Sequence, residues 1–581
     1  MDVAERVARA APWRSEALAR VREWLGLNWP ITCVLVAFAG SAFIVPTLAP
    51  VATTDDWGYT RSVEILVREG RLTVFPVVAA TAVFQIGWGA LFALLFGMTL
   101  GVMRVATVVM VALGGVGLYA LLRELGVQRG RSALGVAAYL FSPLAFVLAY
   151  TFMTDSYLTS LLIIATYCYV RGLRPEQVSS SMIVAGSVVA ACAFLTRQQG
   201  ALIPLAVVTY LLLSRRLRPN RAGLGLFLQI VAIPVGATVA YYVWLKYFND
   251  VPNVQTGFLD EARNAGVSGG WRLTRHLLFI ALMYLGFFCL PIVIALIPGL
   301  RRLVRGMPTG GWILFLGWEP LLILGLATSY LAGRWMPYVP QFVGAGGLGP
   351  PDVLGSRPRM FDGRFFDWAT FVCAASAFLF ALVLCRGFAA SLRSHPGAAL
   401  LLTITLWQVI GIIPPSFHYL RRGYSLDRYL LPLLPLGLCL VLWAARDLRL
   451  AQPAAWFVVA VFALFAVAGT RDYLVFMHAV WDMASAANAA GVRNERLDAG
   501  AAWDGYHLYT YGLETGITRA RTRPGPWWTY FYGKATNSSY VVAGRPRTRY
   551  ATVWVRPYSS WLQRRPTKVY LLRRYGIPAP P

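Results

Sequence analysis

Two adjacent aspartates, Asp55 and Asp56, are the first residues of the chain whose types and spacing suggest chemistry. They follow a long apolar stretch and precede an amphipathic segment, in the sequence PVATTDDWGYTRSVEILVREG. A carboxylate in this position acts as a general base toward a hydroxyl group when a close like charge or partial burial raises its pKa. The alternative is an aspartate that only caps a helix on a solvated loop. This loop alone leaves both interpretations open.

Further polar residues lie at the ends of later apolar stretches. Asp155, in TFMTDSYL, occupies a very short connection, where it either lines a polar cleft or only caps the next helix. Arg197, in FLTRQQGALIP, either holds a phosphate or snorkels to lipid head groups. The segment PPSFHYLRRGYSLDRYLLPLLPL either binds a lipid phosphate or anchors helices. Its polar residues are His418, Arg421, Arg422, Asp427 and Arg428. Asp427 alternatively pairs only with Arg428.

The composition identifies the class of protein that must position these residues. The 581 residues are 57% hydrophobic and only 14% charged, with a mean hydropathy of +0.56, far more apolar than a soluble protein of this size. Apolar stretches long enough to cross a hydrocarbon core of roughly 30 Å alternate with short loops. The sequence therefore predicts an all-α polytopic membrane protein.

Thirteen apolar stretches are predicted to be transmembrane helices. They are 30–48, 101–122, 132–150, 156–171, 180–195, 199–214, 223–246, 273–298, 312–332, 367–385, 398–415, 429–446 and 454–470. Arg-rich connections, expected in the cytoplasm, alternate with connections that hold nearly all the acidic loop residues. The acidic connections, predicted to face outward, are 49–100, 151–155, 248–272, 333–366 and 416–428.

Three parts of the chain follow from this pattern. We predict a cytoplasmic basic arm at 1–28, a transmembrane domain at 29–470 whose first outer loop is 49–100, and an extracytoplasmic α+β domain at 471–581. The whole is expected in the plasma or inner membrane. Segment 82–98 is interpreted as a helix along the outer interface, because a span there would place every later loop on the opposite side of the membrane.

Two local patterns leave more than one interpretation. In the C-terminal domain, four aromatic residues either receive a sugar or polymer by stacking or belong to an aromatic core. They are Trp503, Trp527, Trp528 and Tyr530. The glycine-rich segment GAGGLGPPD at 344–352 resembles a phosphate-binding loop but lacks the Lys-Ser/Thr ending. We interpret this segment as a flexible outer loop.

Other binding chemistries are not expected. The net charge of +27 would suit nucleic acid, but the basic residues lie mostly in short loops between apolar segments and in the C-terminal region, which is the membrane pattern. All seven cysteines fall inside predicted helices, so neither a disulfide framework nor a cysteine metal site is expected. No pair of histidines has the spacing of metal ligands.

Several segments, taken in order, resemble one family. These are the acidic pair with Tyr59, the helix ending in LLFG, the LLRELG and SPLAFVLAYTFMTD segments, the TRQQG turn and the late DRYLLPLLP. Over residues 28–446 the chain resembles the GT-C glycosyltransferases of the protein O-mannosyltransferase and aminoarabinose transferase type, which use polyprenyl-phosphate sugars. The resemblance implies that Asp55 is the catalytic base with Asp56 beside it. It also implies that Asp155 is a second acid.

The resemblance further implies the reaction and its partners. A hexosyl or pentosyl group would pass, with inversion, from a polyprenyl-phosphate donor to a lipid, glycan or protein acceptor of the cell envelope, within membrane lipids. Cations would stabilise the leaving phosphate. Some relatives use a divalent metal cation at such acids and others do not, and the sequence leaves this open. The residues expected at the phosphate are Arg197, Arg428, Arg421 and Arg422, and those expected to line the site are Tyr59 and His418.

Two other classes of protein compete with a glycosyltransferase. One is a transporter or flippase of lipid-linked sugar, and the other is a non-catalytic scaffold for envelope assembly. A transporter needs charged residues near the bilayer midplane, whereas the residues singled out above lie at the predicted outer ends of helices. The sequence therefore favours an enzyme.

Overall fold

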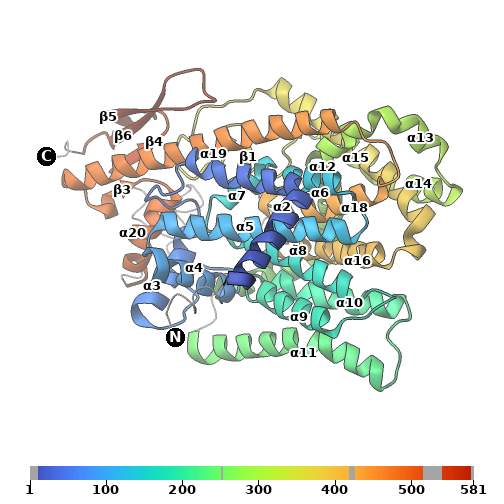
Figure 1. Cartoon of the computed structure of the whole chain (residues 1–581). Coiled ribbons are helices and arrows are strands. Elements are labelled where there is room, and N and C mark those ends of the chain that lie inside the picture. Colours follow the sequence, from blue (N-terminus) through green and yellow to red (C-terminus); the bar gives the residue numbers. More distant parts are fainter. Residues whose placement is uncertain (1–10, 250–252, 418–424, 515–538, 578–581) are drawn as a thin grey trace, which may run out of the picture.

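The helices of the chain lie side by side, and a small domain with β-strands sits at one end of them, here called the domain end (Figure 1). The computed structural model describes residues 11–249, 253–417, 425–514 and 539–577. The predicted class, a multi-pass all-α membrane protein with a small C-terminal α+β domain, is confirmed.

The elements of the membrane part follow the apolar stretches of the sequence. They are α2 (Ala11–Gly40), α3 (Asp56–Glu69), α4 (Val83–Phe96), α5 (Leu100–Glu124), α6 (Arg129–Leu140), α7 (Pro143–Ala149), α8 (Thr154–Gly172), α9 (Ser180–Phe194), η2 (Gln198–Ala201), α10 (Leu202–Leu213), α11 (Arg221–Trp244), α12 (Asn253–Leu296), α13 (Leu300–Arg305), α14 (Thr309–Leu331), β1 (Val343–Gly344), β2 (Gly347–Leu348), α15 (Gly363–Ser391), α16 (Pro396–Gly411), α17 (Ile413–Ser416), η7 (Asp427–Leu430), α18 (Leu433–Ala444) and α19 (Gln452–Ala489).

Each of the thirteen predicted spans coincides with a helix or a helix pair. Nine described helices are long and apolar enough to cross a membrane, and the bent pair α6–α7 makes ten. Helices α4, α9 and η2–α10 are apolar but shorter than 18 residues. Whether α4 spans or lies along the interface, and the total of thirteen, stay predictions.

Apolar side chains cover the flanks of these helices. Val36 on α2, Leu94 on α4 and Leu464 on α19 are each 65 to 73% exposed. A helix satisfies its own backbone hydrogen bonds, so such a surface is stable in hydrocarbon but not in water. These flanks are therefore the lipid-facing surface.

A bend between α6 and α7 shapes the domain end. The two helices meet at 66°, where Ser142 leaves the helix and Pro143 begins the next one. Proline disfavours helical geometry in the residue before it and suits a first helical position. The bend turns the chain so that the short link from Tyr150 to Met153 joins α7 to the start of α8.

The structure differs from the sequence prediction in three places. Residues 253–272, expected in an outward connection, are helical and belong to α12, whose only non-helical residue is Gly266. The domain boundary expected at 470 falls inside α19, a single helix of 38 residues. The glycine-rich segment, expected to be a flexible loop, contains part of an antiparallel hairpin of β1 and β2, whose second strand is buried.

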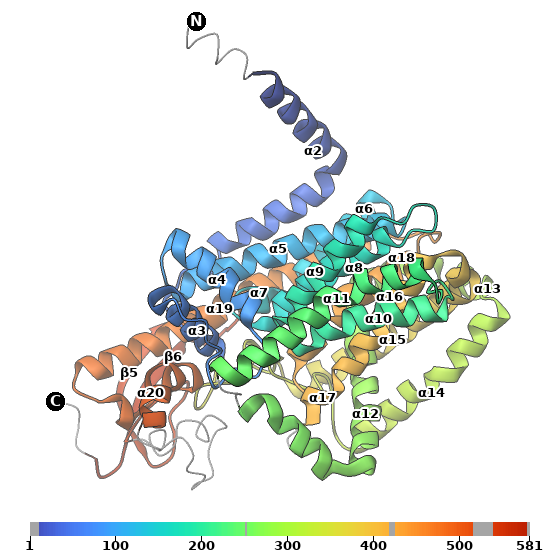
Figure 2. The same cartoon turned by 90° about the horizontal axis from the view of Figure 1, so that it is seen from below.

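The C-terminal domain combines α20 (Ala501–Glu514) with β3 (Leu497–Asp498), β4 (Tyr540–Ala543), β5 (Tyr550–Tyr558) and β6 (Thr567–Arg574). The strand order is β3-β4-β6-β5, and only the β3–β4 pair is parallel. Both views place this domain beside α3 and the end of α19 (Figure 2).

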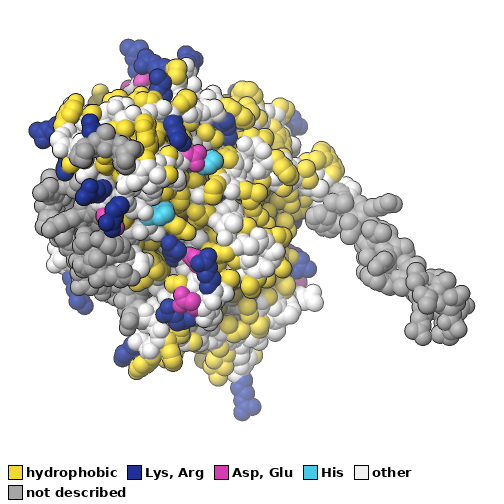
Figure 3. Space-filling model, turned by 90° about the vertical axis from the view of Figure 1, so that its left-hand side faces the viewer, with side chains coloured by type: hydrophobic (Ala, Val, Ile, Leu, Met, Phe, Trp, Pro, Cys, Tyr) yellow, Lys and Arg dark blue, Asp and Glu magenta, His cyan; other side chains and the backbone are white. Residues whose placement is uncertain are grey.

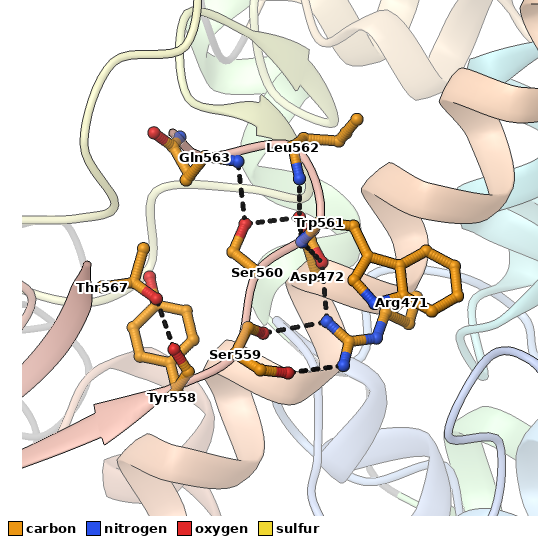
Figure 4. A network of polar contacts seen from close by, with 9 residues as sticks. All are labelled: Arg471, Asp472, Tyr558, Ser559, Ser560, Trp561, Leu562, Gln563 and Thr567. Atoms are coloured by element: carbon orange, nitrogen blue, oxygen red, sulfur yellow. Dashed lines mark hydrogen bonds and ion pairs between the residues drawn. The ribbon is translucent and has the colours of Figure 1, made fainter. Parts of the chain in front are cut away.

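A polar network fastens the domain to α19 (Figure 4). Asp472 accepts hydrogen bonds from the backbone N–H groups of Trp561 and Leu562, each at 2.9 Å, and from the hydroxyl of Ser560 at 2.5 Å. The neighbouring Arg471 donates to the carbonyl and the hydroxyl of Ser559. The loop after β5 is therefore held on the same helix that runs through the membrane part.

Candidate active site

Arg104 holds the connection that precedes the acidic pair. Its guanidinium, 1% exposed and near the start of α5, donates to the backbone carbonyls of Thr47 at 3.0 Å and Ala49 at 2.7 Å, and to that of Val51. Sequence analysis missed this residue. Its signal was an arginine one turn inside an otherwise apolar helix, which implies a buried partner.

Asp56 is a buried part of this loop. Both of its carboxylate oxygens accept hydrogen bonds from Thr53, at 2.6 Å from the backbone N–H and 2.5 Å from the hydroxyl. Burial raises the pKa of Asp56 to about 6, and the charge of Arg104 opposes this rise. Asp56 therefore closes the turn that begins α3.

Asp55 differs from its neighbour in exposure and partner. Its side chain is one-third exposed, and its Oδ2 lies 3.3 Å from Nη2 of Arg428. It occupies the N-cap position of α3, yet its side chain makes no capping hydrogen bond. The capping interpretation therefore does not describe Asp55, whose carboxylate points to a residue 373 positions away.

Asp155 and Arg197 form a buried ion pair. Their side chains are 3% and 12% exposed, and Nη1 of Arg197 contacts Oδ1 of Asp155 and lies 3.5 Å from the hydroxyl of Thr154. The guanidinium also lies 4.9 Å from the centre of the Tyr429 ring. Arg197 therefore does not snorkel, and Asp155 is more than a helix cap.

Arg428 lies at the same place, brought there by η7. Its guanidinium is 5.6 Å from the centre of the Tyr429 ring and its side chain is 9% exposed. The preceding Asp427 points elsewhere, because its Oδ2 accepts hydrogen bonds from backbone N–H groups of the segment that leads into β1. The donors are Gln341 at 3.2 Å, Phe342 at 2.7 Å and Val343 at 2.8 Å.

Tyr59 completes the cluster from the first turns of α3. Burial raises the pKa of Tyr59 to about 12, the charges of Arg428 and Arg197 oppose the rise, and Asp55 adds to it. The phenol therefore stays protonated at neutral pH and keeps a hydrogen to donate. Asp55, Tyr59, Asp155, Arg197 and Arg428 thus meet at the domain end, although they come from four separate segments.

Viewed from the domain end, acidic and basic side chains lie near one another, and apolar side chains cover the right-hand flank (Figure 3). Three predicted site residues, His418, Arg421 and Arg422, lie outside the described residues. Trp503 is 3% exposed and packs on Trp481 and His507, as an aromatic core would. Trp527, Trp528 and Tyr530 lie outside the described residues.

The described residues do not fit a divalent metal. They contain no group of three or more His, Cys, Asp or Glu side chains that could hold one. Both oxygens of Asp56 already accept hydrogen bonds, and Asp55 faces a guanidinium. The carboxylates described at this site are therefore engaged with protein donors and do not form a preorganised ligand set.

Comparison with known proteins gives one family match. Residues 88–242, 155 of the 581, match the family model described as dolichyl-phosphate-mannose-protein mannosyltransferase. The predicted resemblance to the GT-C glycosyltransferases of the protein O-mannosyltransferase type is confirmed over these residues. No curated protein sequence matches the chain.

Solved structures give looser similarities. ArnT from Cupriavidus metallidurans bound to undecaprenyl phosphate is 14% identical with a TM-score of 0.39, over 96% of this chain and all of that one. The Archaeoglobus fulgidus oligosaccharyltransferase in complex with Zn and sulfate is 12% identical with a TM-score of 0.45, over 88% of this chain and 68% of that one. The superpositions are loose, so no residue is equated across them.

The Asp155–Arg197 pair predicts a coupled effect on stability. Removing one partner leaves the other charge buried and uncompensated, so Asp155→Asn and Arg197→Gln should each lower the free energy of unfolding by roughly 3 kcal/mol. The double variant should lose less than the sum of the two. The free energy of unfolding in detergent is measured for the wild type, the two single variants and the double variant. Additive losses would show that the two charges do not stabilise each other.

Asp56 predicts a pH dependence of stability. Its folded pKa of about 6 exceeds the ordinary value of 3.8, so the folded state favours the protonated form. Its contribution is fully present below about pH 4 and is lost as pH rises through 6. Between pH 4 and 7 the Tm of the wild type should fall relative to that of Asp56→Asn. Glu69→Gln, on the same helix, is the control, and parallel curves for wild type and Asp56→Asn would contradict the prediction.

Proposed function

We propose that the protein transfers a sugar from a polyprenyl-phosphate donor to a hydroxyl group of an envelope lipid, glycan or protein, with inversion and with Asp55 as the general base. The observation that carries this proposal is the meeting of a partly exposed carboxylate with two buried guanidiniums at the domain end. The match to mannosyltransferases that use dolichyl phosphate mannose supports the class of donor.

The difference between the two aspartates supports Asp55 as the base. A base must reach the acceptor hydroxyl, within about 3 Å of its oxygen. Asp55 is one-third exposed, whereas Asp56 is 2% exposed and both its oxygens bind Thr53. Asp56 therefore serves the shape of the loop, and Asp55 has a free approach for a substrate.

The two arginines supply a site for the donor phosphate. Arg197 and Arg428 both lie against Tyr429, so two like charges are held close together in a poorly hydrated place. Asp155 contacts Arg197 and Asp55 contacts Arg428, and each guanidinium is a planar fork of N–H donors. A phosphate oxygen is the acceptor that such forks bind best.

The proposed step needs no redox partner. Asp55 takes the proton of the acceptor hydroxyl while the acceptor oxygen forms a bond to the anomeric carbon. The bond between that carbon and the phosphate oxygen breaks on the opposite face, and the phosphate leaves with the electron pair. Arg197 and Arg428 stabilise the negative charge that develops there, and Tyr59 donates a hydrogen bond to it.

A transporter is the second candidate class, and one acidic residue within a helix could indicate a transport pathway. Glu319, which sequence analysis passed over, lies near the midpoint of α14 and lines a groove of about 440 Å³ among apolar residues of α14 and α15. An acid at that depth would suit a transport pathway if it faced the bundle interior. Helix α14 is largely exposed, so Glu319 sits on the flank, and the enzyme remains the better-supported function.

Three substitutions test the roles of the charged residues. With labelled polyprenyl-phosphate sugars and candidate acceptors, Asp55→Asn should lower kcat by about 10² to 10⁴-fold, because the base is lost while the donor site is kept. Asp56→Asn should retain far more activity. Arg428→Gln should weaken binding of the polyprenyl phosphate as well. Undiminished transfer by Asp55→Asn would refute the assignment of the base.

The predicted orientation has its own test. We propose that the domain end faces outward, because the acidic connections lie there and Arg-rich connections lie at the other end. A periplasm-dependent phosphatase fused after Pro581 should then be active, and a fusion after Arg305 should be inactive. The opposite pair of results would place the domain in the cytoplasm.

A further inference from the structure

Helix α3 packs very closely on helix α20 of the C-terminal domain. Trp57, next to Asp56 and 1% exposed, lies with its ring centre 5.4 Å from that of Tyr509 on α20 and 5.9 Å from that of Phe75. Gly505 of α20 faces the same indole. A Cβ atom added there would lie 2.3 Å from Cε2 of Trp57 and 2.4 Å from its Nε1.

A second contact lies one turn farther along α3. Nη2 of Arg61 donates to the backbone carbonyl of Tyr506 at 3.1 Å, and its guanidinium carbon lies 4.1 Å from the centre of that ring. Trp57 and Arg61 are four residues apart and therefore share one face of α3. The two helices thus touch along a full turn, through a large aromatic contact and a charged one.

Helix α20 is itself held firmly. The backbone N–H of Ala501 donates to the carbonyl of Asp352 at 2.9 Å, and the buried Asp504 accepts the backbone N–H of Ala499 at 3.1 Å. Trp503 of α20 packs edge to face on Trp481 of α19, with ring centres 5.1 Å apart. The face that meets α3 is therefore fixed to a helix that continues into the membrane part.

The start of α3 alone does not fix the direction of that helix. Thr53 and Arg104 hold the turn before it, whereas the contact of the Asp55 carboxylate within the described part of the chain is the 3.3 Å one to Arg428. A small rotation of α3 about this turn would move the Asp55 carboxylate. A displacement of about 1 Å at a reacting group can cost 10²-fold in rate.

We propose that Gly505 and Tyr506 of the C-terminal domain are positioning residues for the reaction, because through Trp57 and Arg61 they hold α3 in the orientation that directs Asp55 into the site. The inference rests on the proposed glycosyl transfer. The C-terminal domain is thereby a part of the catalytic unit.

Gly505→Ala tests the contact, with Thr510→Ala on the exposed side of α20 as the matched control. The added Cβ should push the indole of Trp57 and lower kcat at least about tenfold, while the KM for the donor stays near that of the wild type because Arg197 and Arg428 do not move. Hydrogen exchange should become faster in the amides of residues 57–69. Thr510→Ala should change neither quantity.

A double variant separates positioning from general damage to the fold. Trp57→Leu removes the atoms that the new Cβ would meet, so adding Gly505→Ala to Trp57→Leu should cost no further activity or exchange protection. The inference is overturned if Gly505→Ala behaves like the wild type, or if it costs the same in both backgrounds. If the wild type transfers no sugar, the proposed function is refuted. Hydrogen exchange of the α3 amides then still decides whether the contact with α20 positions that helix.

Discussion

The structure of the candidate site depends on the need to compensate a buried arginine. The guanidinium of Arg104, 1% exposed inside a helix bundle, is shielded from bulk solvent and must find acceptors within the protein. It finds them in the backbone carbonyls at positions 47, 49 and 51, which are thereby turned toward α5. These contacts hold the connection that leads into Asp55, Asp56 and the start of α3.

The same requirement organises the rest of the domain end. Asp155 and Arg197 are buried together, and Arg428 lies beside Tyr429 within reach of Asp55. Each charge has a partner from a different segment, so the segments are locked to one another. Such buried pairs add little net stability but are costly to break singly, which favours one arrangement of the loops over others. Two guanidiniums held at the edge of an apolar bundle suit a lipid-borne anion.

The C-terminal domain is joined to this arrangement by continuous structure. Helix α19 runs without interruption from the apolar flank to the domain, and Asp472 on it holds the loop after β5. Helix α20 then returns to α3. Contacts at α19 and at α3 therefore both oppose motion of the domain relative to the membrane part. A domain on a flexible linker would lack such contacts.

The sequence by itself determined the membrane class, the places of the apolar helices and the kinds of residue at their ends, because run length and side-chain chemistry are local properties. It also marked Asp55, Asp155, Arg197 and Arg428 as candidates. The tertiary structure alone decided which of them meet, since the partners of the two ion pairs are 42 and 373 residues apart. It also separated the exposed Asp55 from the buried Asp56 and revealed Arg104. Burial and partnership depend on the packing of distant segments, which no local pattern of residues records.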